Sequence, residues 1–323
     1  MADFNNRTGD AIFDGTLKQA LAIQLGQSPF LNIFPEDSVR ETLSYMGRSP
    51  NEQVTTAIAR EICERRGIKA MLTGSISSLG RNYAIALEAR NCRTGGSLAQ
   101  QQVEVQGKEQ VLRGLDKAAS KVRAQLGESL SSIQRFDAPI EQVTTTSLEA
   151  LQAYSLAQQH LARGADEDTT IPFLKHAIAL DPNFAMADAT LGNIYGGSTV
   201  PGNDVISIEY LKKAFELRDR VSEREKLYFA SRYYQSVTRE LDKAAESYEL
   251  SKSTYPRDAR PYGNLAGIYI GIGQYEKAAE NASEAIRLRP DHIFVYQILA
   301  GAYVGLNRWA EAKAICDKAA IFC

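Results

Sequence analysis

The sequence predicts an α/β N-terminal domain followed by an all-α array of helix–turn–helix hairpins. The second half of the chain repeats with a period of about 34 residues, whereas residues 1–135 do not repeat and alternate helical with strand-like patterns. The chain has 323 residues, of which 44% are hydrophobic and 24% charged, a composition typical of globular proteins with two or three domains. We therefore expect a domain at residues 1–135, a linker at 136–146 and the array at 147–323.

The clearest copy of the repeat spans residues 259–291, and a shift by one period places it on the next copy. Large residues then match large ones, and small residues match small ones. The matched pairs are Tyr262 and Tyr296, Leu265 and Leu299, Ala266 and Ala300, Tyr269 and Tyr303, Ala278 and Ala312, and Ala285 and Ala319. The order Tyr-x2-Leu-Ala-x2-Tyr, followed by Ala, Ala and Pro, resembles the tetratricopeptide repeat, a helix–turn–helix unit.

The physical chemistry of this copy agrees with a helical hairpin. Gly271 and Gly273 separate two helical patterns, and the second carries Ala278, Ala282 and Ala285, which allow helices to approach closely. One hairpin cannot bury its apolar faces alone, so neighbouring hairpins must stack into a solenoid of about five.

Earlier hairpins follow the same pattern with one insertion. The separation between Tyr195 and Ala214 exceeds that between Tyr269 and Ala285 by three positions. We place the extra residues at 196–204 (GGSTVPGND), in a loop between two helices. The array ends inside a helix without a polar capping helix, and we expect it to be truncated there, as part of a longer protein.

Residues 1–135 combine helix signals with turn signals. We expect three antiparallel strands joined by tight turns and flanked by helices, with a strand stub before the first helix. The expected helices are 10–26, 35–46, one opened by a capping box at 49–52 and ending at Gly67, and 110–133; the expected strands are 2–4, 30–34, 68–77, 83–89 and 97–105.

The whole chain is similar to a known bacterial arrangement. The segments FNNRTGDAIFD, QSPFLNIFP, GIKAMLTGSI and SLEALQAY resemble a TolB amino-terminal-like α/β domain followed by tetratricopeptide repeats. This pair resembles the accessory region behind the catalytic domain of bacterial serine/threonine protein kinases. The resemblance implies a non-catalytic sensor or scaffold for protein–protein interaction in signal transduction. Similar pairs lie behind winged-helix transcription regulators and adenylate cyclases, and a third alternative is small-molecule sensing by the N-terminal domain.

No enzymatic motif stands in the sequence. A glycine-rich loop before a strand lysine, HRD, DFG and a phosphate-binding P-loop are all absent, so we predict no catalytic residue and no cofactor. Three histidines lie far from any cysteine cluster, and the four cysteines form no CxxC, so we expect free thiols and no metal site. Cys316 aligns with Ala282, which predicts a small core residue.

Charge and hydropathy limit the partners and the location. The formal net charge of −2 argues against nucleic acid binding, and no apolar run is long enough to span a membrane. The N-terminal residues MADFNNRTGD lack the apolar core of a signal peptide. We therefore expect a cytoplasmic module whose parent could be tethered to a membrane by an upstream segment.

The groove of the array is the first candidate site, with a protein or peptide partner. Residues that flank the packing positions of the first helices mix aromatic, amide and basic groups, which suit an extended peptide with some acidic character. These residues are Asn193, Lys226, Phe229, Tyr233, Arg260, Asn264, Phe294 and Gln297. Packing against neighbouring segments is an equal alternative. A clamp for a C-terminal carboxylate is not expected, because Ala189 stands where such a clamp has lysine.

A second candidate is the loop that holds Asn5, Asn6, Thr8, Gly9 and Asp10. A strand that leads into a helix N-terminus can hold an anion with its backbone amides. However, Asp10 would repel a phosphate and is itself a good helix cap. Capping and turn formation are therefore the favoured interpretation, and ligand binding is the alternative.

Overall fold

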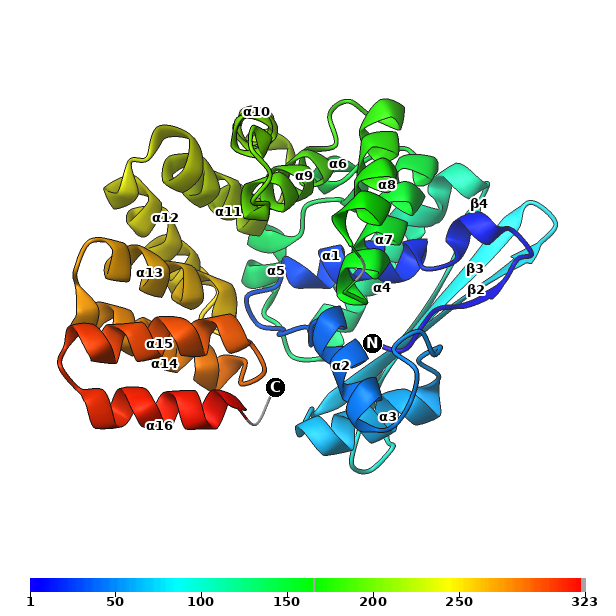
Figure 1. The fold of residues 1–323 in the computed structure, drawn as a ribbon. Coiled ribbons are helices and arrows are strands. Elements are labelled where there is room, and N and C mark those ends of the chain that lie inside the picture. Colours follow the sequence, from blue (N-terminus) through cyan, green and yellow to red (C-terminus); the bar gives the residue numbers. More distant parts are fainter. Residues whose placement is uncertain (165, 321–323) are drawn as a thin grey trace. The chain divides into compact units, whose positions relative to one another are not determined.

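The computed structural model describes residues 1–164 and 166–320 (Figure 1). The chain divides into two compact units, Met1–Glu223 and Arg224–Cys323, and each is described by itself. We call them unit 1 and unit 2.

Unit 1 begins with a four-stranded sheet in the order β1-β2-β3-β4. Strand β1 runs parallel to β2, and β2, β3 and β4 form the predicted antiparallel meander. The strands are β1 (Asn5–Arg7), β2 (Ala70–Leu79), β3 (Asn82–Asn91) and β4 (Ser97–Gln106). The strand predicted at 2–4 lies at residues 5–7. Residues 2 and 3 are held outside it, because the amide of Ala2 donates to the carbonyl of Leu72 and the amide of Asp3 donates to the carbonyl of Val54.

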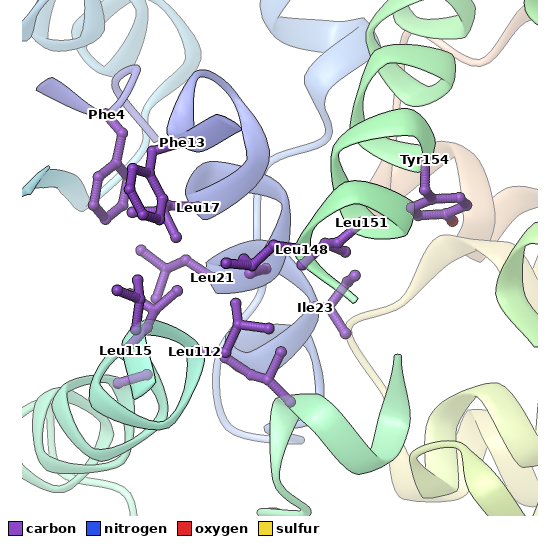
Figure 2. Close-up of a cluster of buried hydrophobic side chains, with 14 of the residues drawn as sticks. Phe4, Phe13, Leu17, Leu21, Ile23, Leu112, Leu115, Leu148, Leu151 and Tyr154 are labelled. Atoms are coloured by element: carbon purple, nitrogen blue, oxygen red, sulfur yellow. The ribbon is translucent and has the colours of Figure 1, made fainter. Parts of the chain in front are cut away.

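Helices pack on the sheet. Two of them, over residues 36–45 and 56–66, end at the predicted glycines Gly47 and Gly67, which both have positive φ. In this part of unit 1 the helices are η1 (Ala11–Phe13), α1 (Thr16–Gly26), α2 (Glu36–Tyr45), α3 (Thr56–Arg66), η2 (Lys108–Gln110), α4 (Val111–Gln125), α5 (Leu130–Phe136) and α6 (Ile140–Val143). Helix α4 packs on β3 and β4. Figure 2 shows leucines of α1, α4 and α7 meeting phenylalanines from the N-terminal segment in one core.

Four local predictions were wrong. The helix predicted at 10–26 is divided into η1 and α1 by Gly15, whose φ is +73°. Residues 30–34 form no strand, because their backbone pairs with no strand of the described sheet; Leu31 and Ile33 pack on the core of Figure 2, and Phe34 packs on the core beneath α2 and α3. The box at 49–52 caps no helix, since Thr55 is the N-cap of α3. The helix predicted at 110–133 breaks at Gly127, whose φ is +99°.

The segment predicted to be a linker is packed. Ile140 and Val143 of α6 are 1% and 0% exposed, and they share a continuous core with α1 and α7. The structural division at Glu223 and Arg224 groups the first two hairpins with the sheet. The domain boundary near residue 135 stays a prediction about which segment folds independently.

A buried charge network joins α4 to the segment that follows it. Arg123 is 0% exposed and donates to both carboxylate oxygens of Glu128, at 2.8 and 2.9 Å, and to Asp137 Oδ1 at 2.6 Å. Ser28 and Ser132 also donate to Glu128, and Gln24 donates to Asp137, each at 2.7 Å. The pairing is complete, which is the condition under which buried charges are tolerated.

Asp116 lies near this network and predicts a pH dependence. Its burial and the neighbouring carboxylate of Asp137 raise the pKa of Asp116 to about 7. A pKa raised above its unfolded value stabilises the fold at low pH, and this contribution is lost as the pH rises through about 7. At pH 8 we expect the free energy of unfolding of Asp116→Asn to exceed that of the wild type by about 2 kcal/mol, which moves the urea midpoint to a higher concentration. At pH 5 this difference should be smaller. Urea titrations followed by circular dichroism at both pH values measure this, and a gap of equal size at both would contradict it.

The expectation of free cysteines was wrong for two of the four. Cys63 and Cys92 form a disulfide with Cα atoms 5.9 Å apart, buried beneath α2 and α3. Cys316 is an exposed free thiol and not a core residue. Ala282, its counterpart, is buried because α15 follows it, whereas no helix among the described residues follows α16. Cys323 lies outside the described residues.

The predicted solenoid is present as five hairpins in the described part of the chain. Unit 1 holds α7 (Leu148–Ala162) with α8 (Glu167–Leu180), and α9 (Ala185–Gly197) with α10 (Asn203–Glu216). A short 3₁₀ helix, η3 (Arg218–Arg220), precedes the remaining pairs, α11 (Glu223–Tyr233) and α12 (Leu241–Thr254), α13 (Ala259–Gly271) and α14 (Tyr275–Leu288), and α15 (Ile293–Gly305) and α16 (Trp309–Ala319). The insertion lies between α9 and α10 as predicted.

Candidate peptide-binding surface

The first helices of the last two hairpins have opposite inner and outer faces. On α13, Leu265, Ala266 and Tyr269 are buried, and on α15 the matching Leu299 is buried as well. Residues spaced by three or four from Arg260 therefore lie on the other side of α13. The outer stripes comprise Arg260, Asn264, Gly267 and Gly271 on α13, and Phe294, Gln297, Gly301 and Val304 on α15.

Glycines bring the two stripes together. A Cβ atom at Gly301 would lie 3.4 Å from Ile270 Cδ1, and one at Gly267 would lie 3.9 Å from Ile298 Cδ1. The first helices are therefore neighbours, and their glycines leave backbone uncovered between larger side chains. We call these two outer stripes the glycine surface. A peptide backbone can approach a glycine more closely than another residue, because glycine has no side chain of its own.

Exposed apolar groups border the glycine surface. Phe294 is 62% exposed and Val304 is 42% exposed, although each is large enough to favour burial. Scattered exposed residues are ordinary, but these two occupy the same face of one helix. An apolar side chain of a bound peptide has a place to pack here.

Arg260 places a guanidinium group at one end of this surface. Its guanidinium donates to both oxygens of Asp258, at 3.0 and 2.7 Å, and Arg224 donates to the same carboxylate at 2.7 Å. Burial of Asp258 works against its ionisation, but the two arginines outweigh burial and hold the pKa of Asp258 below its usual range. Two guanidinium groups share one carboxylate, and the carboxylate of Glu225 also acts on Arg260, so the charges of these four residues balance.

The structure brings together four of the eight predicted groove residues. Arg260 and Asn264 lie on α13, and Phe294 and Gln297 lie on the adjacent α15. Asn193 lies on α9 of unit 1. The other three, Lys226, Phe229 and Tyr233, lie on α11, where Phe229 is buried and offers no ring to a ligand.

Sequence reasoning missed the glycines of this surface. The prediction considered which side chains could contact a peptide, and glycine has none. The available signal was the period: one full repeat separates Gly267 from Gly301, and the same interval separates Gly271 from Gly305.

The loop of residues 5–10 uses its polar groups internally. Asn6 Oδ1 accepts from the backbone and hydroxyl of Thr8, at 3.0 and 2.7 Å, and Asp10 Oδ1 accepts from the amide of Ile12 at 3.0 Å. Lys108 donates to Asp10 Oδ2 at 2.8 Å, and this bond and the Ile12 amide lower the pKa of Asp10. The contacts favour the capping interpretation for Asn5, Asn6, Thr8, Gly9 and Asp10, and the ligand role stays an alternative.

No group of three or more His, Cys, Asp or Glu side chains in residues 1–164 and 166–320 could hold a metal ion. Within the same residues, no helix combines the length and apolar character that crossing a bilayer requires.

Stacked hairpins with an open first-helix face define a helical-repeat protein. Residues 259–292, which form α13 and α14, match the family model of the tetratricopeptide repeat, so this hairpin is a tetratricopeptide repeat. Proteins built from these repeats mediate protein–protein interaction. None of the curated proteins compared with the chain matches it.

Several solved structures are similar to about half of the chain. MamA from Desulfovibrio magneticus is 21% identical, over 54% of this chain and 94% of that one, with a TM-score of 0.38. PilF from Pseudomonas aeruginosa is 18% identical, over 54% and 77%, with a TM-score of 0.41. YrrB, described as a repeat protein with an unusual peptide-binding site, is 15% identical, over 54% and 86%, with a TM-score of 0.35.

Proposed function

We propose that the chain is a non-catalytic interaction module that binds an extended peptide on the glycine surface of α13 and α15. The observation that carries this proposal is the neighbouring pair of outer stripes, where Gly301 is exposed on the same helix as the exposed ring of Phe294. Apolar anchors on the peptide would pack on Phe294 and Val304, and an acidic residue would lie toward Arg260. Amide groups of Asn264 and Gln297 supply hydrogen bonds along the same face.

We also propose the setting of this module. The resemblance of residues 1–135 and of the following repeats to the region behind bacterial kinase domains supports an accessory role beside a serine/threonine kinase, in the cytoplasm. The alternatives are a winged-helix regulator or an adenylate cyclase as the output domain. The gene upstream of the codon for Met1 decides among them, because it would encode kinase motifs, a basic winged helix or a cyclase domain.

A single substitution tests the peptide surface. Gly301→Leu places a large side chain over the open backbone, where a Cβ meets only ordinary van der Waals contact at 3.4 Å. Leucine also has a higher helix propensity than glycine, so α15 should keep or gain stability. Peptides selected from a displayed random library against the wild-type chain should bind the variant at least about tenfold more weakly, measured by fluorescence anisotropy.

Ser283→Leu on α14 is the matched control, because it adds the same side chain to an exposed place on a second helix. It should leave the affinity unchanged. Equal affinity of Gly301→Leu and the wild type, with α15 still folded, would refute binding on this surface.

A further inference from the structure

Strand β4 is an open edge of the sheet. Among the described residues it pairs with β3 alone, and its ten residues make it as long as the two inner strands. The edge on the other side ends in β1, which has only three residues.

The hydrogen-bond register shows which backbone groups of β4 face outward. A two-residue turn joins β2 to β3, so Leu79 and Asn82 exchange hydrogen bonds, and every second residue of β3 from Asn82 onward also bonds to β2. The residues of β4 opposite these are Gln106, Glu104, Gln102 and Gln100, and they direct their amides and carbonyls away from β3.

An independent contact confirms this register. The amide of Gln100 donates to the side chain of Gln125 at 3.1 Å, which is possible only if it points away from β3. Gln125 therefore satisfies one outward amide. The outward backbone groups of Gln102 and Glu104 remain available to another strand.

The sequence of β4 does not protect this edge. Natural edge strands are usually blunted by lysine, proline or several charges. Strand β4 reads SLAQQQVEVQ, with a single charge at Glu104 and neither lysine nor proline. Its even-numbered side chains from Gln100 to Gln106 are exposed.

This strand is complementary to itself. If two copies pair antiparallel about a two-fold axis at Val103, Gln102 faces the second copy's Glu104, and Glu104 faces its Gln102. Each of these two pairs exchanges two backbone hydrogen bonds. The only charge of the strand then faces a neutral amide, so no like charges meet, and the half-buried Val103 packs on its counterpart.

We propose that β4 is a dimerisation edge whose occupant is β4 of a second copy of this chain, paired antiparallel with Val103 on the two-fold axis. The two sheets of unit 1 would form one continuous sheet. An isologous interface of this kind closes on itself, so it yields dimers and not filaments. The edge lies in unit 1 and does not depend on the peptide surface of unit 2.

Charge substitutions at Gln102 test both the pairing and its register. We expect wild-type protein to show a monomer–dimer equilibrium in sedimentation equilibrium, at concentrations on the order of micromolar. Gln102→Glu would place glutamates opposite each other twice and weaken the dimer by up to about tenfold, while Gln102→Lys would pair with Glu104 and strengthen it. Adding Glu104→Gln to Gln102→Glu should restore the wild-type constant.

Two further variants complete the experiment. Gln102→Pro should abolish the dimer without removing a bond of the sheet, because the lost amide points away from β3. Gln274→Glu adds the same charge on an exposed residue of unit 2 and should change nothing.

Several results would overturn the proposal. A wild-type chain that stays monomeric up to about 100 µM, more than tenfold above the expected range, would do so. A Gln102→Pro variant that still dimerises, and whose circular dichroism spectrum matches that of the wild type, would also overturn the proposal. Equal weakening by Gln102→Lys and Gln102→Glu would reject the Val103-centred register. The exposed charge variants decide the question even if the proline variant does not fold.

Discussion

Replacing Arg123 with alanine is expected to lower the free energy of unfolding of unit 1 by about 3–5 kcal/mol. The substitution leaves the carboxylate of Glu128, whose side chain is 1% exposed, buried without its cation. Asp137 loses its bond to the same guanidinium. Removing one partner of a buried pair costs more than the pair contributes, because the remaining charge stays desolvated.

The loss should depend on pH. Burial of Glu128 opposes its ionisation, but Arg123, Ser28 and Ser132 outweigh burial and lower the pKa of Glu128. A lowered pKa stabilises the fold above the unfolded value of about 4.3, and this contribution disappears as the pH falls through the folded value. In Arg123→Ala the unpaired buried carboxylate takes up a proton more readily, so the difference from the wild type should narrow as the pH falls below neutral and be smallest below about pH 4.

Hydrogen exchange of the slowest amides in β3 measures this effect in unit 1 at neutral pH, and urea titrations give the acidic range. Arg65→Ala is the matched control, because Arg65 pairs with Glu61 on the surface of α3, where both side chains are more than a third exposed. Its effect should stay within about 0.5 kcal/mol. Similar losses for both variants would show that the buried network contributes no more than a surface pair.

The helical array was predictable because its signal is periodic and local. The hairpins repeat the same packing positions at a nearly constant interval, and glycine and proline mark their ends. The antiparallel meander was predictable for a similar reason, since the turns at Gly80 and Gly95 both have positive φ and lie between alternating segments. Such features depend on neighbours in sequence and need no knowledge of distant contacts.

The errors arose where distant contacts decide the structure. The helix after β4 ends early at Gly127, whose positive φ turns Glu128 back toward Arg123. The glycine is visible in the sequence, but the ion pair that makes it end the helix is not. The disulfide joins Cys63 and Cys92 across α3 and the sheet, with a separation of 29 residues and no spacing motif. On the glycine surface, the glycines of α13 and α15 form a shared face only because the two helices lie side by side, and the sequence of one helix alone does not indicate this.

Leu265→Ala is expected to destabilise unit 2 by about 3–5 kcal/mol. Leu265 is 0% exposed on α13 and lies in a core shared with α12, α14 and α15. Alanines dominate the facing positions of α14, so there are few large side chains that could move into the cavity. The cost should therefore approach the upper part of the range for this substitution.

Trp309, the only tryptophan of the chain, lies on α16 of unit 2 and provides a local fluorescence signal. Its urea transition should move to lower denaturant in Leu265→Ala with an unchanged slope. Leu250→Ala, which removes the same atoms from a half-exposed place on α12, should shift the midpoint only slightly. In a solenoid, stability is a sum of hairpins and the interfaces between them, so a lost contact in one hairpin should be felt at Trp309 in the next. An unmoved tryptophan transition would mean that the last hairpin unfolds independently of its neighbour, contrary to the shared core.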